Sequence, residues 1–284
     1  MSGMVKSVGH SSELLKILLG NVDKYIQLMD SQANRLSRAY PDKELAVIFS
    51  MLSKKILTIG PMSYCDLFAS DLGIKCPKEV LVAIGLVCLP ITTHDDVVDE
   101  TPKKRLQLAA FIYAGDIAML EGLKVLSTKK HTSVAKVLID AVNQNHYYQQ
   151  LRVKYLWERK PKTFEDYKVG IKDVPVLVKV GLDCACAIAD ASHPIRRRVN
   201  QFASGYGIAL QIIDDIREVD EDRVSGYNSF PLLEGKPFKK SCQELDKQIL
   251  AAKQALLPKW TKMRSYISRV ERVASEIKRE VCGA

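Results

Sequence analysis

Two apolar stretches that each run into a cluster of acidic residues constrain this chain most. Residues 79–89 are apolar after Glu79 and lead into residues 94–100, which include four acids. Residues 202–213 are nearly all apolar and lead into residues 214–222, which include six acids. A helix that is apolar on every face belongs in the interior of a bundle. We therefore predict two buried helices that place negative charge at one end of the bundle core.

The rest of the chain is also patterned for helices. Apolar residues recur at spacings of three and four, as at Leu45, Ile48, Phe49 and Leu52, which is the period of an amphipathic helix. No alternating β-branched run predicts a strand. Prolines predict helix boundaries at positions 41, 61, 77, 102, 161, 194 and 237. We expect about nine or ten helices in an all-α, single-domain bundle over residues 1–284.

Composition excludes several classes of protein and leaves the partner open. The 47% hydrophobic and 26% charged residues exclude disordered and collagen-like chains. The longest apolar stretch, residues 80–91, is shorter than the roughly 20 residues of a spanning helix. Seven cysteines without a C-x-x-C pair indicate free thiols in a reducing compartment. The short apolar stretch and the free thiols together predict a soluble, cytoplasmic protein with at most peripheral membrane contact. The net charge of +9 favours an anionic partner.

The spacing of the acids is typical of a metal site. Asp95 and Asp99 are four residues apart, with Asp96 beside them; Asp214, Glu218 and Asp222 repeat that spacing, with Asp215 alongside. Residues four apart share a helix face, where like charges repel unless cations neutralise them. Oxygen ligands without His or Cys suit Mg²⁺ or Mn²⁺. The predicted metal ligands are Asp95, Asp96, Asp99, Asp214, Asp215 and Glu218; the alternative is two solvated helix ends.

These motifs resemble those of a known family. Residues 95–99 resemble the first aspartate-rich motif of trans-isoprenyl diphosphate synthases, the polyprenyl synthetases of the class I terpenoid synthase superfamily. Residues 210–215 resemble the second motif, including Gln211 before it. Lys104 and Arg105 stand where the family carries an Arg-Arg pair. Residues 113–116 resemble the Ala-Gly-Asp sequence that opens the next helix in that family. The resemblance covers about residues 45–235 and keeps the family's order of motifs.

The resemblance implies a fold, a reaction and a set of site residues. The fold would be an isoprenoid-synthase bundle with a central active-site cavity, in a homodimer. Mg²⁺ ions, three in the family, would help ionise an allylic diphosphate, whose cation condenses with isopentenyl diphosphate as pyrophosphate leaves. The implied catalytic residues are Asp95, Asp96, Asp99, Asp214 and Lys172. The implied substrate-binding residues are Lys54, Lys55, Lys104, Arg105 and Gln211.

The sequence also departs from the family pattern, which leaves three functions open. The isopentenyl-diphosphate motif is reduced to residues 52–58, where Leu57 replaces an arginine, and Lys172-Asp173 stands for a Lys-Thr pair. Leucine cannot offer the bidentate fork of arginine to a phosphate. The first function is an elongating prenyltransferase with a divergent second site. The second is a class I terpene synthase or a prenyltransferase with a non-standard acceptor, and the third is a weakly active partner subunit.

Two other function classes fit the residues less well. The His94-Asp95 dipeptide occurs in all-α metal phosphohydrolases, but the histidine available upstream is His10, and the second acid cluster would be unexplained. The basic stretch at residues 239–279 is interspersed with acids, which is typical of a solvated amphipathic face. We therefore expect no nucleic-acid partner.

Overall fold

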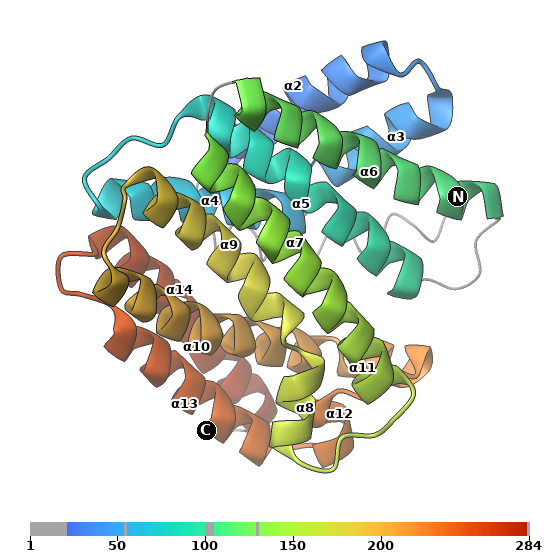
Figure 1. Ribbon diagram of the computed structural model, residues 1–284. Coiled ribbons are helices and arrows are strands. Elements are labelled where there is room, and N and C mark those ends of the chain that lie inside the picture. Colours follow the sequence, from blue (N-terminus) through green and yellow to red (C-terminus); the bar gives the residue numbers. More distant parts are fainter. Residues whose placement is uncertain (1–21, 54–55, 100–104, 129–130, 283–284) are drawn as a thin grey trace. The chain divides into compact units, whose positions relative to one another are not determined.

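The chain folds into helices. A computed structural model describes residues 22–53, 56–99, 105–128 and 131–282, and Figure 1 shows the course of the chain. These residues form thirteen α-helices and one π-helical turn, and none of them lies in a strand. The all-α prediction is confirmed, whereas the expected number of helices was too low. Short helices such as α8 (Phe164–Gly170), α11 (Val219–Ser225) and α12 (Phe230–Glu234) span too few turns to show a period.

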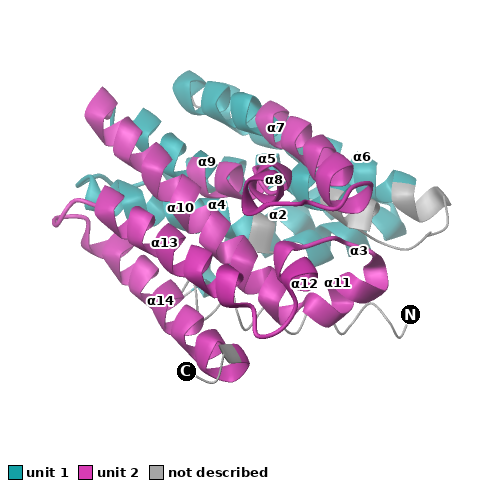
Figure 2. Ribbon diagram, turned by 90° about the horizontal axis from the view of Figure 1, so that it is seen from below, with its two compact units in different colours: residues 1–142, 180–190 teal, residues 143–179, 191–284 magenta. Residues whose placement is uncertain are grey.

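The helices group into two compact units, coloured separately in Figure 2. Unit 1 comprises residues 1–142 and 180–190. In it, α5 carries the first apolar stretch and packs mainly against α6 and α4. Its helices are α2 (Asp23–Ala39), α3 (Lys43–Leu52), α4 (Ile56–Asp71), α5 (Lys78–Asp99), α6 (Arg105–Thr128), the first part of α7 (Thr132–Arg152) and the last part of α9 (Asp173–Ile188).

Unit 2 comprises residues 143–179 and 191–284. Besides the remaining parts of α7 and α9, the π-turn Val153–Trp157, α8, α11 and α12, it contains α10 (His193–Arg217), α13 (Lys239–Ala255) and α14 (Thr261–Cys282). The helix α10 carries the second apolar stretch and packs mainly against α13. The single-domain organisation expected for residues 1–284 stays a prediction.

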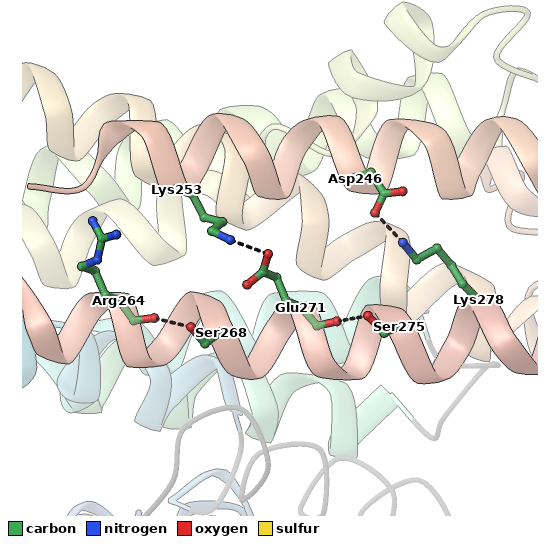
Figure 3. Close-up of polar contacts among 7 residues, drawn as sticks. All are labelled: Asp246, Lys253, Arg264, Ser268, Glu271, Ser275 and Lys278. Carbon is green, nitrogen blue, oxygen red and sulfur yellow. Dashed lines mark hydrogen bonds and ion pairs between the residues drawn. The ribbon is translucent and has the colours of Figure 1, made fainter. Parts of the chain in front are cut away.

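The basic C-terminal stretch forms the amphipathic helices α13 and α14. Lys253 pairs with Glu271 at 2.7 Å, and Lys278 pairs with Asp246 at 2.6 Å, as Figure 3 shows. These ion pairs are partly exposed, so each contributes only about 0–1 kcal/mol. The buried apolar face of α14 dominates its packing energy; it consists of Met263, Tyr266, Ile267, Val270, Val273, Ala274 and Ile277.

One predicted helix boundary is wrong. The helix α4 continues through Pro61, although proline cannot donate to the carbonyl four residues earlier. The helix is instead stabilised by packing around the proline, since Ile59, Met62 and Cys65 are fully buried. Packing of these side chains offsets the lost hydrogen bond.

We expect Gly205→Ala to destabilise unit 2. A Cβ atom at Gly205 in α10 would lie 2.7 Å from the Gln248 carbonyl oxygen and 3.1 Å from the Ala252 nitrogen of α13. Overpacking of this kind costs about 1–3 kcal/mol of unfolding free energy, which urea titration measures. The control is Ser204→Ala at the neighbouring exposed position. Equal stability of the two variants would contradict this close helix contact.

None of the helices in the described ranges is both long and apolar enough to cross a membrane. Six cysteines of these ranges are buried as thiols, namely Cys65, Cys76, Cys88, Cys184, Cys186 and Cys242.

Candidate active site

The second acid cluster lies at the junction of α10 and α11 in unit 2. The helix α10 ends at Arg217, and Glu218 joins it to α11. The hydrogen-bond ladder continues across this junction: the Glu218 N–H donates to the Asp214 carbonyl at 2.9 Å, and the Asp222 N–H donates to the Glu218 carbonyl at 2.8 Å. These two bonds keep Asp214, Glu218 and Asp222 one helical turn apart from each other, although Glu218 itself has non-helical backbone angles.

Asp215 is the most deeply buried acid of this cluster. Its relative exposure is 3%. Burial, with added repulsion from Asp222 and Asp214, raises the pKa of Asp215 to about 8, although hydrogen bonds from Tyr167 and Gln211 act in the opposite direction. A carboxylate whose pKa is raised this far needs either a proton or a cation near it.

The other acids of the cluster repel one another as well. Burial raises the pKa of Asp214 to about 6, against the opposing charges of Arg152 and Arg217. Burial also raises the pKa of Asp222 to about 6; a hydrogen bond with Ser229 acts in the opposite direction, and the charge of Asp214 adds to the rise. Desolvation and the neighbouring carboxylates, Asp214 first, raise the pKa of Glu218 to about 8. Because Glu218 is an exposed residue, we attribute more of its shift to these charges than to burial.

Both oxygens of Asp215 accept hydrogen bonds. The Gln211 amide Nε2 donates to Oδ1 at 2.6 Å, and the Tyr167 hydroxyl donates to Oδ2 at 2.5 Å. Burial, followed by the charge of Asp215, holds the pKa of Tyr167 well above its usual value. Tyr167 therefore stays a hydrogen-bond donor at neutral pH.

A buried ion pair adjoins these residues. Arg152, the last residue of α7, places Nη2 at 2.7 Å from Oδ2 of Asp173 and at 3.4 Å from Oε1 of Gln211. The side chains of Arg152 and Asp173 are 11% and 4% exposed. Sequence reasoning missed Arg152 and Tyr167, and considered Asp173 only as a departure from a Lys-Thr pair. No local pattern marks them, because their partners lie between 21 and 59 residues away in sequence.

The donor chemistry of the cluster fits a hard divalent cation. The cluster supplies carboxylate oxygens from Asp214, Asp215, Glu218 and Asp222 and contains no His or Cys, which is the ligand set that Mg²⁺ and Mn²⁺ prefer. In the part of the chain that the structure describes, no group of three or more His, Cys, Asp or Glu side chains is arranged to hold a metal ion, so Asp214, Asp215 and Glu218 are not brought together as three ligands of one ion. Mg²⁺ is usually held by one or two carboxylates together with water and phosphate oxygens, so such a site does not need three protein ligands.

Several other predicted site residues lie outside the described part of the structure. The helix α5 extends to Asp99, but the side chains of Asp95, Asp96 and Asp99 are not among the described ones. The same holds for Lys54, Lys55, Lys104 and the side chain of Arg105. Just before this motif, burial lowers the pKa of His94, against the charge of Asp116.

Lys172 is an exposed residue in the turn between α8 and α9. Its Nζ is 5.9 Å from the centroid of the Tyr148 ring. It lines a pocket of about 540 Å³ in unit 2, together with Lys168, Lys179 and Ser204. The neighbouring Asp173 is buried and pairs with Arg152. Two consecutive residues thus differ in environment, and only Asp173 joins the residues around Asp215.

Comparison with known proteins identifies the fold. No protein-family model matches the sequence. Component 2 of the heptaprenyl diphosphate synthase of Geobacillus stearothermophilus is 24% identical over 212 residues, which are 69% of this chain and 65% of that protein. The chain thus matches just under two thirds of the length of that relative.

Solved structures of trans-prenyl diphosphate synthases share this fold. A decaprenyl diphosphate synthase from Rhodobacter capsulatus has a TM-score of 0.67 at 13% identity, over 86% of this chain and 99% of that one. A geranylgeranyl pyrophosphate synthase from Corynebacterium glutamicum has a TM-score of 0.66 at 16% identity, over 97% and 98%. The resemblance drawn from the motifs is therefore confirmed at the level of the fold.

Proposed function

We propose that this chain, which has the fold of trans-prenyl diphosphate synthases, is a prenyltransferase. Its reaction would ionise an allylic diphosphate, condense the allylic cation with isopentenyl diphosphate and release pyrophosphate. The observation that carries this proposal is the second acid cluster, in which α10 delivers closely spaced and partly buried carboxylates at its C-terminal end. The names of the proteins that share the fold support the same reaction class.

Carboxylates from both motifs would hold Mg²⁺, with Mn²⁺ as a possible substitute. The proposed ligands are Asp95, Asp96, Asp99, Asp214, Asp215 and Glu218. When bound, the cations would neutralise the charge of the departing diphosphate, which lowers the barrier to ionisation. We take the bound cations to be three, as in the family that the motifs resemble.

Basic and amide side chains would bind and orient the diphosphates. We propose this role for Lys54, Lys55, Lys104, Arg105, Lys172 and Gln211. Lysine and arginine bind phosphate oxygens by charge-assisted hydrogen bonds. The apolar side chains of α10, such as Ile208 and Ile212, would help keep water from the allylic cation.

A second candidate function follows from the spacing of the acids. Asp214, Glu218 and Asp222 match the spacing of the second metal motif of class I terpene synthases, although Glu218 stands where that motif has a serine. Leu57 replaces the arginine of the isopentenyl-diphosphate motif. A chain with these features can instead cyclise the allylic cation or pass it to another acceptor. A partner subunit of low activity is the third candidate, since one relative is named as a component of its synthase.

We also propose that the chain forms a homodimer. Large apolar side chains are exposed on α6 and α7 of unit 1, at Ile112, Tyr113, Leu120 and Ile139. Exposed apolar side chains of this size are common at interfaces between subunits.

One assay tests the proposed reaction. The purified chain is incubated with geranyl, farnesyl or geranylgeranyl diphosphate, with and without isopentenyl diphosphate, and released pyrophosphate is measured. We expect Mg²⁺-dependent release that stops when EDTA is added. Longer diphosphates indicate elongation, whereas hydrocarbons or alcohols formed without isopentenyl diphosphate indicate the second candidate. If no allylic diphosphate gives pyrophosphate, the enzyme proposal is wrong.

A further inference from the structure

We propose that Tyr167, Gln211, Arg152 and Asp173 form a positioning chain that fixes the carboxylate of Asp215 for cation binding. The four side chains come from α8, α10, the end of α7 and the start of α9, and all belong to unit 2. They are positioning residues, since they act on the cation through Asp215. This inference rests on the proposed metal-dependent function.

Two hydrogen-bond donors fix the orientation of the Asp215 carboxylate. Its Oδ1 accepts from Gln211 at 2.6 Å and its Oδ2 accepts from Tyr167 at 2.5 Å. Two donors on different oxygens fix both the rotation and the tilt of the carboxylate plane. Each carboxylate oxygen has two lone pairs, so one on each oxygen remains for a cation.

The Tyr167 side chain is held rigidly by its surroundings. The helix α8 begins with a capping box between Thr163 and Asp166, which defines its first turn. The Tyr167 ring is fully buried and packs against Phe164 and Phe230, with ring centroids 5.6 and 6.0 Å apart. The hydroxyl therefore reaches Asp215 from a side chain that has little freedom to move.

The orientation of the Gln211 amide is determined by Arg152. Its oxygen and nitrogen have nearly the same shape, so neighbours decide which one faces Asp215. Arginine can only donate, and Nη2 of Arg152 lies 3.4 Å from Oε1 of Gln211. The amide oxygen therefore faces Arg152, and the amide N–H₂ faces Asp215.

Arg152 is in turn anchored by Asp173. Asp173 pairs with the same Nη2 atom at 2.7 Å, and the Asp173 carbonyl accepts from the Asn145 amide at 3.3 Å. A buried ion pair is weak evidence for stability, because desolvation offsets much of the attraction. We assign this ion pair the role of holding Arg152 where it orients the Gln211 amide.

Two variants and one matched control test the positioning chain. Tyr167→Phe removes one donor to Asp215 and keeps the ring. Arg152→Lys keeps a charge beside Asp173, but the lysine side chain ends one bond short of the Nη2 position, so we expect its ammonium to stay at Asp173 and to lose the 3.4 Å contact with Gln211. The control Tyr25→Phe removes another buried hydroxyl that donates to a carboxylate, that of Asp66 at 2.9 Å. The full chain is titrated with Mn²⁺ in the presence of inorganic pyrophosphate, and bound Mn²⁺ is followed by electron paramagnetic resonance.

We expect both variants to bind Mn²⁺ at least about tenfold more weakly, as is typical when hydrogen-bond partners of metal ligands are removed. Tyr25→Phe should bind as the unmodified chain does. Melting temperatures report folding, and Arg152→Lys should retain a cooperative transition if its role is orientation. Unchanged Mn²⁺ affinity in Tyr167→Phe and Arg152→Lys would overturn the inference and leave the proposed function intact. Failure of the unmodified chain to bind Mn²⁺ would overturn both.

Discussion

Asp214→Asn is expected to reduce pyrophosphate release from an allylic diphosphate by at least about a thousandfold, which corresponds to about 4 kcal/mol of transition-state stabilisation. Asp214 is the first acid of the series that continues from α10 into α11. Its replacement keeps the shape of the side chain but removes a charged oxygen donor for the proposed cation. Cation stabilisation of the leaving diphosphate is worth several kcal/mol.

The matched control for this variant is Asp220→Asn. Asp220 is an exposed acid of the same segment whose partner is Arg223, at 2.9 Å. Its replacement should leave pyrophosphate release within about twofold of the original, since surface pairs of this kind contribute little. Circular dichroism and melting temperature show whether both variants fold. Full activity of a folded Asp214→Asn variant would exclude the second acid cluster from the reaction.

The metal-free chain is expected to lose stability as the pH rises from about 5 to about 8. The pKa of Asp215 is raised from 3.8 to about 8, so the folded state holds a proton that the unfolded state has released. Stability from such a group is present at low pH and is lost as the pH rises through the folded pKa. For Asp215 alone this amounts to at most about 4 kcal/mol over that range.

Urea unfolding in EDTA at a series of pH values measures this dependence, and Asp215→Asn provides the comparison. The amide carries no titrating proton, so the variant should lose less stability between about pH 5 and about pH 8. His94 acts in the opposite direction, because its lowered pKa favours the neutral form in the folded chain. Added Mg²⁺ with pyrophosphate should stabilise the unmodified chain most at the higher pH, where the carboxylates are charged. If the free energy of unfolding falls equally with pH in the two proteins, the raised pKa of Asp215 is contradicted.

The prediction of secondary structure from sequence succeeded where one local property decides the outcome. The recurrence of apolar residues at every third or fourth position was sufficient to predict helices. Proline predicted helix boundaries less reliably, because Pro61 lies within α4 among fully buried neighbours. A lost backbone hydrogen bond is a local effect, whereas the packing that offsets it depends on residues far away in sequence.

The sequence by itself determined the spacing of the acids at positions 214, 218 and 222, since helical geometry relates residues four apart wherever a helix forms. It also determined the all-α class and the oxygen-only character of the proposed ligands. Only the tertiary structure decided which acid is buried and what holds it. Asp215 meets Tyr167 of α8 directly, and Arg152 at the end of α7 reaches it through Gln211. These contacts join residues up to 59 positions apart, and the packing of separate helices, which no local pattern encodes, brings them together.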